Sequence, residues 1–188
     1  MLKDGGIIIY PTETLYAVGA VATPSGPVNR VYEIKDRAYG KPVPVLVRDV
    51  SMMERYVYLN VDALSLIDEF MPGALTLVLT DRGKLHDGIS AGTGKVAVRI
   101  SAHPFVQGLF NHLDEPITST SANTSGGENL FDSNQLMDWF EDKVDLIVDT
   151  GTISESKGST VLDMTLKPPI FLREGDISPH RIKELIKW

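Results

Sequence analysis

The chain has 188 residues, a length that fits one domain with a buried core. Hydrophobic residues make up 43% of it, yet no apolar run approaches the roughly 18–20 residues of a membrane span, so we do not expect a membrane protein. The net charge of −7 argues against nucleic-acid binding over the whole surface, and the absence of cysteine excludes disulfides, thiolate metal sites and a cysteine nucleophile. With no signal-peptide pattern at the N-terminus, we expect a cytoplasmic protein.

Strand and helix patterns alternate along the chain. Segments rich in β-branched and aromatic residues predict strands, and apolar residues spaced to share one face predict helices. In chain order we expect strands at 6–10 and 15–21, a helix that starts at about 28, runs into 35–37 and stops by 40 or 42, a strand at 43–47, a helix at 61–71, a strand at 75–79, a loop at 81–94, a strand at 95–100, a helix at 103–113, a strand at 116–120, a helix at 133–140, strands at 144–148, 160–164 and 170–172, and a helix after 178–179. This order predicts one α/β (α+β) domain over residues 1–188, built on a twisted mixed sheet.

Two common kinds of site are not supported by the sequence. The glycine-rich segment 88–95 has five residues between Gly88 and Gly94, a valine after Lys95, and a strand where a phosphate-binding loop needs a helix. Ser119 and Ser121 lie outside any G-x-S-x-G pattern, and the histidines lack a metal-binding spacing. We therefore expect neither a phosphate loop, nor a serine hydrolase, nor a metal site formed by the protein.

Three polar clusters remain as candidate sites. The first is a group of cations, Lys35, Arg37 and Lys41, at the end of the first predicted helix; alternatively, these residues are solvated charges that favour the helix dipole. The second is the hydroxyl- and amide-rich segment 118–127, which offers donors to an anion unless it is an ordinary serine- and threonine-rich turn.

The third cluster joins the first two predicted strands. Pro11 removes a backbone donor and fixes the direction of the chain, and Thr12, Thr14 and Tyr16 offer three hydroxyl groups within five residues. A simple hairpin needs none of these groups. We therefore interpret the segment as part of a binding site.

Taken together, these residues resemble the YrdC family, the threonylcarbamoyl-AMP synthases of tRNA modification. The resemblance covers most of the chain, and its individual segments are weak signals that become specific when they occur in this order. The matching segments are 11–16 (PTETLY), 35–37 (KDR), 72–76 (PGALT), 96–99 (VAVR), 121–123 (SAN), 159–161 (STV) and 172–175 (LREG).

The resemblance implies a fold and an activity. The implied fold is a twisted open mixed sheet with flanking helices and a concave basic cavity, which would place cations inside an acidic protein. The implied reaction condenses ATP, L-threonine and bicarbonate into L-threonylcarbamoyl-adenylate and pyrophosphate, with Mg²⁺ carried by the nucleotide. Other proteins would then move the threonylcarbamoyl group to an adenosine of tRNA.

The resemblance also implies residue roles. Lys35 and Arg37 would be catalytic, stabilising the negative charge that develops on the phosphates. The residues implied for ATP are Arg37, Lys41, Ser121, Asn123 and Arg173. The residues implied for threonine are Thr14, Arg99, Ser119 and Ser159, together with Thr12 and Tyr16, and Arg99 would pair with its carboxylate.

The chain departs from the family pattern at two places. Ala17 stands where the family often has glycine after the tyrosine, and residues 44–47 lack a histidine that some members carry near threonine. One alternative to the synthase is an RNA-binding protein whose basic cavity holds tRNA or double-stranded RNA. Another is a relative that acts on carbamoyl phosphate, against which the absence of cysteine argues, because such relatives carry zinc-binding segments.

Overall fold

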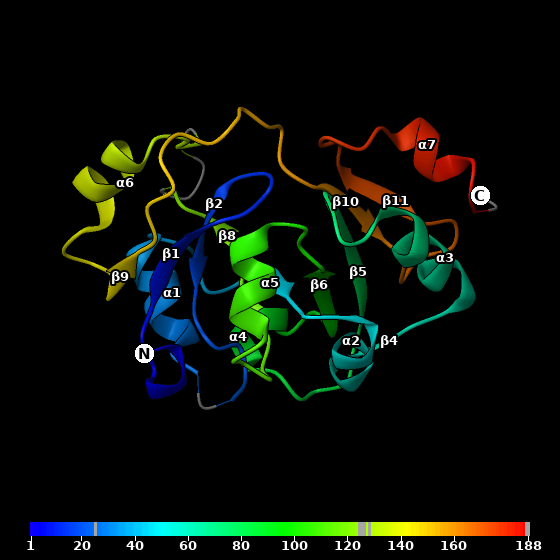
Figure 1. Ribbon diagram of the computed structural model, residues 1–188. Helices are drawn as coiled ribbons and strands as arrows, with labels where there is room; N and C mark the ends of the chain where they lie inside the picture. The colour runs from blue at the N-terminus through cyan, green and yellow to red at the C-terminus, as the bar shows by residue number, and fades with distance from the viewer. Residues whose placement is uncertain (25, 124–126, 128, 187–188) are drawn as a thin grey trace.

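The computed structural model describes residues 1–24, 26–123, 127 and 129–186. In this part of the chain, two mixed β-sheets lie next to each other and helices cover them (Figure 1). The predicted α/β class is confirmed, and the strands divide between two sheets. Among the described residues, no helix is long and apolar enough to cross a membrane.

The first sheet has four strands in the order β8-β2-β1-β9, on the left in Figure 1. Its strands are β1 (Ile8–Pro11), β2 (Tyr16–Gly19), β8 (Thr120–Ser121) and β9 (Leu146–Ile147). Only the β1–β9 pair is parallel among these pairings. Ile9 and Val18 of this sheet belong to one buried apolar cluster with Val31 of helix α1 (Val28–Ile34) and Phe140 of helix α6 (Ser133–Phe140). Burial of these side chains fixes α1, and with it the basic segment that follows.

The second sheet has seven strands, in the order β11-β10-β5-β6-β3-β7 with β4 also paired to β5. Its strands are β3 (Val45–Leu46), β4 (Val57–Tyr58), β5 (Leu75–Asp81), β6 (Lys95–Arg99), β7 (Ile117–Thr118), β10 (Thr160–Asp163) and β11 (Ile170–Arg173). The remaining helices are α2 (Val50–Tyr56), α3 (Val61–Phe70), α4 (Asp87–Ser90), α5 (Pro104–Phe110) and α7 (Pro179–Lys183). The larger apolar core packs around this sheet.

Residues 117–121 join the two sheets. β7 pairs with β3 in the second sheet, and two residues later β8 pairs with β2 in the first sheet. At the crossing point, the backbone N–H of Ser119 donates to the Pro44 carbonyl at 2.8 Å. The single strand predicted at 116–120 is therefore wrong in detail, because the chain changes its partner strand at Ser119.

Most other elements lie where the sequence predicts them, and α6 has the predicted limits. Three elements differ. Helix α2 and strand β4 were not predicted, and the segment expected to be a loop at 81–94 contains the single helical turn α4. Helix α2 begins at a local signal, since the Asp49 carboxylate accepts a hydrogen bond from the Met52 N–H at 2.7 Å. A short 3-10 helix (Leu2–Asp4) precedes β1.

Candidate active site

A cavity of about 210 Å³ lies between the two sheets. Its walls come from the turn before β2, from β2 and β8 of the first sheet, and from β3, β5, β6, β10 and β11 of the second. The residues that line it are Thr12, Thr14, Leu15, Tyr16, Ala17, Arg37, Pro44, Val45, Leu46, Thr76, Ala97, Arg99, Ser119, Thr120, Ser121, Ser159, Val161 and Arg173. Among the described residues, the lining includes three arginines and many hydroxyl groups but no carboxylate, so the cavity suits anions.

The turn between β1 and β2 is organised by the Thr12 hydroxyl. This group donates to the Leu15 carbonyl at 2.7 Å and accepts from the backbone N–H groups of Thr14 at 3.2 Å and Leu15 at 3.1 Å. The Thr12 N–H also donates to the Leu15 carbonyl at 3.1 Å. Thr12 is buried, and its hydroxyl fixes the turn. Thr12 therefore contributes to the cavity wall by fixing the shape of the turn.

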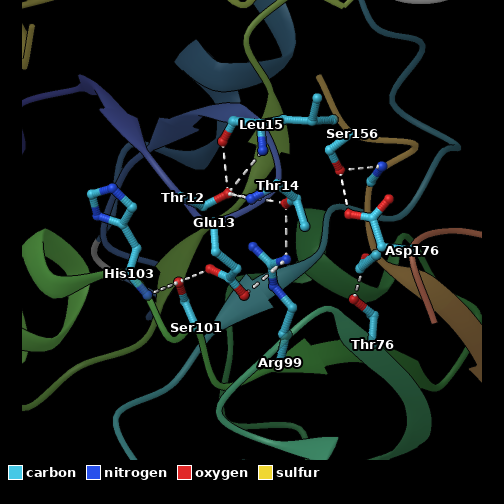
Figure 2. A network of polar contacts seen from close by, with 12 residues as sticks. Thr12, Glu13, Thr14, Leu15, Thr76, Arg99, Ser101, His103, Ser156 and Asp176 are labelled. Carbon is cyan, nitrogen blue, oxygen red and sulfur yellow. Dashed lines mark hydrogen bonds and ion pairs between the residues drawn. The ribbon is translucent and has the colours of Figure 1, made fainter. Parts of the chain in front are cut away.

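Arg99 lies at the end of β6 and faces the same turn. Its side chain is buried, Nη1 donates to the Thr14 hydroxyl at 3.0 Å, and Nη1 lies 3.5 Å from Glu13 Oε1 (Figure 2). Desolvation, and next the charge of Arg99, lower the pKa of Arg173 across the cavity. A guanidinium fixed in this way can meet a carboxylate with two parallel hydrogen bonds.

Ser159 and Arg173 line the cavity as a hydrogen-bonded pair. The Ser159 hydroxyl lies 2.8 Å from Thr76 Oγ1 and accepts from Arg173 Nη2 at 3.0 Å, while Arg173 Nε donates to the Ser159 carbonyl at 2.9 Å. Gly175 permits this arrangement, since a Cβ there would stand 2.2 Å from the Gly158 carbonyl oxygen. The close approach of 158–159 to 173–175 requires glycine.

Arg37 brings the basic segment after α1 to the cavity. Its Nε donates to the Lys41 carbonyl at 3.2 Å and its Nη2 to the Pro42 carbonyl at 2.7 Å, so two backbone groups hold the guanidinium. Burial lowers the pKa of Arg37, although an arginine stays charged at neutral pH. The Lys41 side chain is exposed and does not line the cavity.

Lys35 lies behind the cavity wall. Only 1% of it is exposed, and its ammonium donates to the Ser121 carbonyl, to the Asn123 carbonyl at 2.6 Å and to Asn123 Oδ1 at 3.0 Å. Ser121 Oγ donates to the same Asn123 Oδ1 at 2.7 Å. Lys35 thus ties the end of α1 to segment 121–123, and in this structure its three donors serve that segment.

We expect the burial of Lys35 to appear in the pH dependence of stability. Burial, and next the charge of Arg37, lower the pKa of Lys35 to about 7, whereas a lysine in an unfolded chain has a pKa of about 10.4. Between these values the unfolded chain binds more protons, so the contribution of Lys35 to the free energy of unfolding increases as the pH rises from about 7 to about 10.

Urea unfolding of the wild type and of Lys35→Met across this pH range measures the effect. Subtracting the free energies of unfolding of the two proteins cancels the contributions of the other titrating groups. We expect the free energy of unfolding to rise more steeply with pH in the wild type than in Lys35→Met. Parallel curves for the two proteins would show that Lys35 keeps its ordinary pKa in the folded protein.

Tyr16 and Ser119 complete the predicted set. The Tyr16 hydroxyl donates to the Gly151 carbonyl at 2.7 Å and accepts from the Thr150 N–H at 3.2 Å, so the phenol oxygen holds the segment after β9 while the rest of the side chain lines the cavity. Ser119 lines the cavity at the crossing between the sheets.

Nine of the predicted site residues come together at the cavity, namely Thr12, Thr14, Tyr16, Arg37, Arg99, Ser119, Ser121, Ser159 and Arg173. Lys35, Lys41 and Asn123 do not line it. Sequence reasoning missed the roles of Thr76, which contacts Ser159, and of Glu13, which contacts Arg99. Thr76 could have been predicted as a site residue, because it is the last residue of segment 72–76, which resembles the family.

Comparison with known proteins gives concordant results. Residues 1–175 match the family model Sua5_yciO_yrdC, described as Telomere recombination. A putative threonylcarbamoyl-AMP synthase of Methanocaldococcus jannaschii is 35% identical over 181 residues, which cover 96% of this chain and 85% of the relative. The threonylcarbamoyl-AMP synthase of Pyrococcus abyssi is 32% identical over 98% of this chain, and this chain spans about half of it, 55%.

Solved structures agree with these relatives. P. abyssi Sua5 complexed with L-threonine superposes with a TM-score of 0.94 at 31% identity, covering 99% of this chain and 55% of that protein. Escherichia coli YciO superposes with a TM-score of 0.87 at 27% identity, covering 98% of this chain and 89% of that protein. The resemblance noted in the sequence is confirmed, and the chain belongs to the Sua5/YciO/YrdC family.

Proposed function

We propose that this chain is an L-threonylcarbamoyl-adenylate synthase, which condenses L-threonine, bicarbonate and ATP into threonylcarbamoyl-AMP and pyrophosphate. The observation that carries the proposal is a cavity that the described part of the chain lines with three arginines, a set of hydroxyl groups and no carboxylate. Such a lining favours two anionic reactants held side by side. The synthase names of relatives from M. jannaschii and P. abyssi support the same activity.

The chemistry needs cations more than it needs a strong base. The amine of threonine combines with bicarbonate to give an N-carboxylate and water. An oxygen of this carbamate then attacks the α-phosphorus of ATP, forming the new P–O bond as pyrophosphate leaves with the electrons of the broken one. The nucleophile is already an anion, so the main obstacle is its repulsion by the phosphates, about 1 kcal/mol at ~4 Å in water and several-fold more in a partly dry cavity.

The three arginines divide this work between the two reactants. We propose that Arg99 holds the carboxylate of threonine, with Thr14, Ser119 and Ser159 around the rest of the amino acid. We propose that Arg37 and Arg173 neutralise the triphosphate. Ser121 contacts the nucleotide in this proposal, whereas Lys35 and Asn123 keep segment 121–123 in place. Lys41 would reach the phosphates from outside the cavity.

The Mg²⁺ that this reaction uses is proposed to enter with ATP. The described residues contain no group of three or more histidine, aspartate or glutamate side chains that could hold a metal ion, and the cavity lining has hydroxyl oxygens but no carboxylates. These donors fit a metal whose main ligands are phosphate oxygens and water. When bound, the ion would neutralise phosphate charge, and the arginines of the chain would bind the remaining anionic oxygens.

The product is proposed to serve tRNA modification, with other proteins transferring its threonylcarbamoyl group. Direct RNA binding is not favoured. The net charge of the chain is −7, and the relatives carry synthase names.

The proposal is tested by incubating the protein with Mg·ATP, ¹⁴C-bicarbonate and L-threonine. We expect pyrophosphate and labelled threonylcarbamoyl-AMP in equal amounts, and neither product when threonine or bicarbonate is omitted. L-Serine serves as the matched control for the methyl group of threonine. Pyrophosphate release that is indifferent to threonine would contradict the proposed activity.

A further inference from the structure

Glu13 stands behind the cavity wall, in the same turn as Thr14. Its side chain is absent from the cavity lining, yet Oε1 lies 3.5 Å from Arg99 Nη1 and Oε2 accepts a hydrogen bond from the Ser101 hydroxyl. Figure 2 shows Glu13 and Thr14 both directed at Arg99, whose guanidinium reaches the cavity. Glu13 therefore contacts the arginine that is proposed to meet the substrate without itself lining the cavity.

Ser101 holds the Glu13 carboxylate in a defined direction. Ser101 is fully buried, its hydroxyl oxygen accepts from the His103 N–H at 3.2 Å, and its carbonyl accepts from Gln107 Nε2 at 2.5 Å. Because a backbone donor already occupies the hydroxyl oxygen, the hydroxyl proton is available to Glu13. The chain thus fixes Glu13 through β6 and α5, independently of any ligand.

The ion pair of Glu13 with Arg99 also offsets the repulsion between Arg99 and Arg173. Arg99 is only 5% exposed and repels Arg173 across the cavity. Within the described residues, Glu13 forms the one ion pair of Arg99. Among the described residues, Glu13 Oε1 has no hydrogen-bond partner, so the contact neutralises charge without using an N–H of the guanidinium in a hydrogen bond. The ion pair and the hydrogen bond to Thr14 together direct Arg99, while other N–H groups remain available for a carboxylate.

We propose that Glu13 is a positioning residue, which orients Arg99 for the carboxylate of L-threonine and is itself fixed by Ser101. This inference rests on the proposed function, because it takes threonine as the ligand of Arg99. Glu13 touches no substrate in this arrangement and acts through Arg99 alone. Its removal should weaken recognition of the carboxylate and leave the binding of ATP and the chemical step nearly unchanged.

The test uses the full chain and measures binding and turnover separately. Calorimetry gives the Kd of L-threonine and of L-threoninamide, which lacks the carboxylate, for the wild type, Glu13→Gln, Ser101→Ala and the double variant. We expect Glu13→Gln to weaken threonine binding about tenfold and threoninamide binding less than twofold. In pyrophosphate release, the KM for threonine should rise to the same extent, with kcat and the KM for ATP within twofold of the wild type.

Ser101→Ala should produce a smaller effect of the same kind, about threefold. The double variant should bind threonine no more weakly than Glu13→Gln, because Ser101 acts through Glu13. Thermal unfolding checks that each variant is folded, and Ser101→Ala keeps the test open if Glu13→Gln does not fold.

Other results would overturn the inference. Equal weakening of threonine and threoninamide would make Glu13 a general structural residue. A fall in kcat with unchanged threonine binding would place it in the chemical step. No binding of threonine by the wild type would overturn both this inference and the proposed function. Threonine binding without pyrophosphate release would overturn the function alone, and the binding ratios would still decide the role of Glu13.

Discussion

Replacing Arg37 with alanine is expected to lower kcat/KM for ATP at least 100-fold while the protein remains folded. Arg37 lines the cavity, and two backbone carbonyls accept hydrogen bonds from its side chain, so its loss removes charge that faces the phosphates more than it removes packing. Loss of a fixed donor at a developing negative charge typically raises the barrier by about 3–4 kcal/mol. Pyrophosphate release measures the rate, and circular dichroism measures the fold.

Two control variants sharpen this result. Arg30→Ala removes an arginine from α1 whose partner is Asp145, at 3.3 Å, and activity should stay within twofold of the wild type. Lys41→Ala removes an exposed cation that does not line the cavity, and we expect a loss of less than about tenfold, as for a screened charge. If Arg37→Ala turned over at the wild-type rate, Arg37 would not be part of the active site.

Replacing Arg99 with alanine is expected to raise the KM for L-threonine at least 100-fold. The side chain is buried beside Thr14 and Glu13, so its removal deletes the cation proposed for the substrate carboxylate and leaves a carboxylate without its partner. Truncating one member of a buried charge pair costs about 2–5 kcal/mol of binding free energy, and each 1.4 kcal/mol is a factor of ten. Steady-state kinetics with threonine as the varied substrate measure the effect.

Arg99→Lys separates charge from geometry. Lysine keeps the positive charge but cannot make two parallel hydrogen bonds, so its threonine KM should lie between those of the wild type and Arg99→Ala. The KM for ATP should change less than threefold in both variants. A loss of ATP affinity that exceeds the loss of threonine affinity would assign Arg99 to the nucleotide instead.

The placement of these arginines shows what the sequence could and could not predict. Arg37 and Arg99 were found as cations beside other family-like residues, and the structure brings both to one cavity. The family resemblance assigns Lys35 and Arg37, two residues apart, the same role at the phosphates. At the end of a helix, such a separation can turn one side chain toward the ligand and the other toward the interior, and here Lys35 points to the carbonyls of 121–123. A side chain's direction at a helix end is set by tertiary contacts, which sequence spacing does not reveal.

The polar turn at 11–14 contains a similar division of roles. Its residue types predict a binding site. However, the Thr12 hydroxyl forms hydrogen bonds within the turn, and Glu13 forms an ion pair with Arg99. Of the residues 12–14, Thr14 is the one whose hydroxyl both lines the cavity and contacts Arg99. Neither the contact of Ser101 with Glu13 nor the crossing at Ser119 has a local signal, because each depends on strands that are far apart in the sequence.

The crossing of residues 117–121 from one sheet to the other has a thermodynamic consequence. Opposite walls of the cavity belong to different sheets, so a ligand that touches Thr14 and Ser121 on one side and Arg99 and Arg173 on the other is a cross-link between them. Because such a ligand binds the folded chain and not the unfolded one, it raises the free energy of unfolding by about 2.7 kcal/mol at a ligand concentration of 100 times Kd. Substrate occupancy thus adds contacts between two sheets that already share one apolar core.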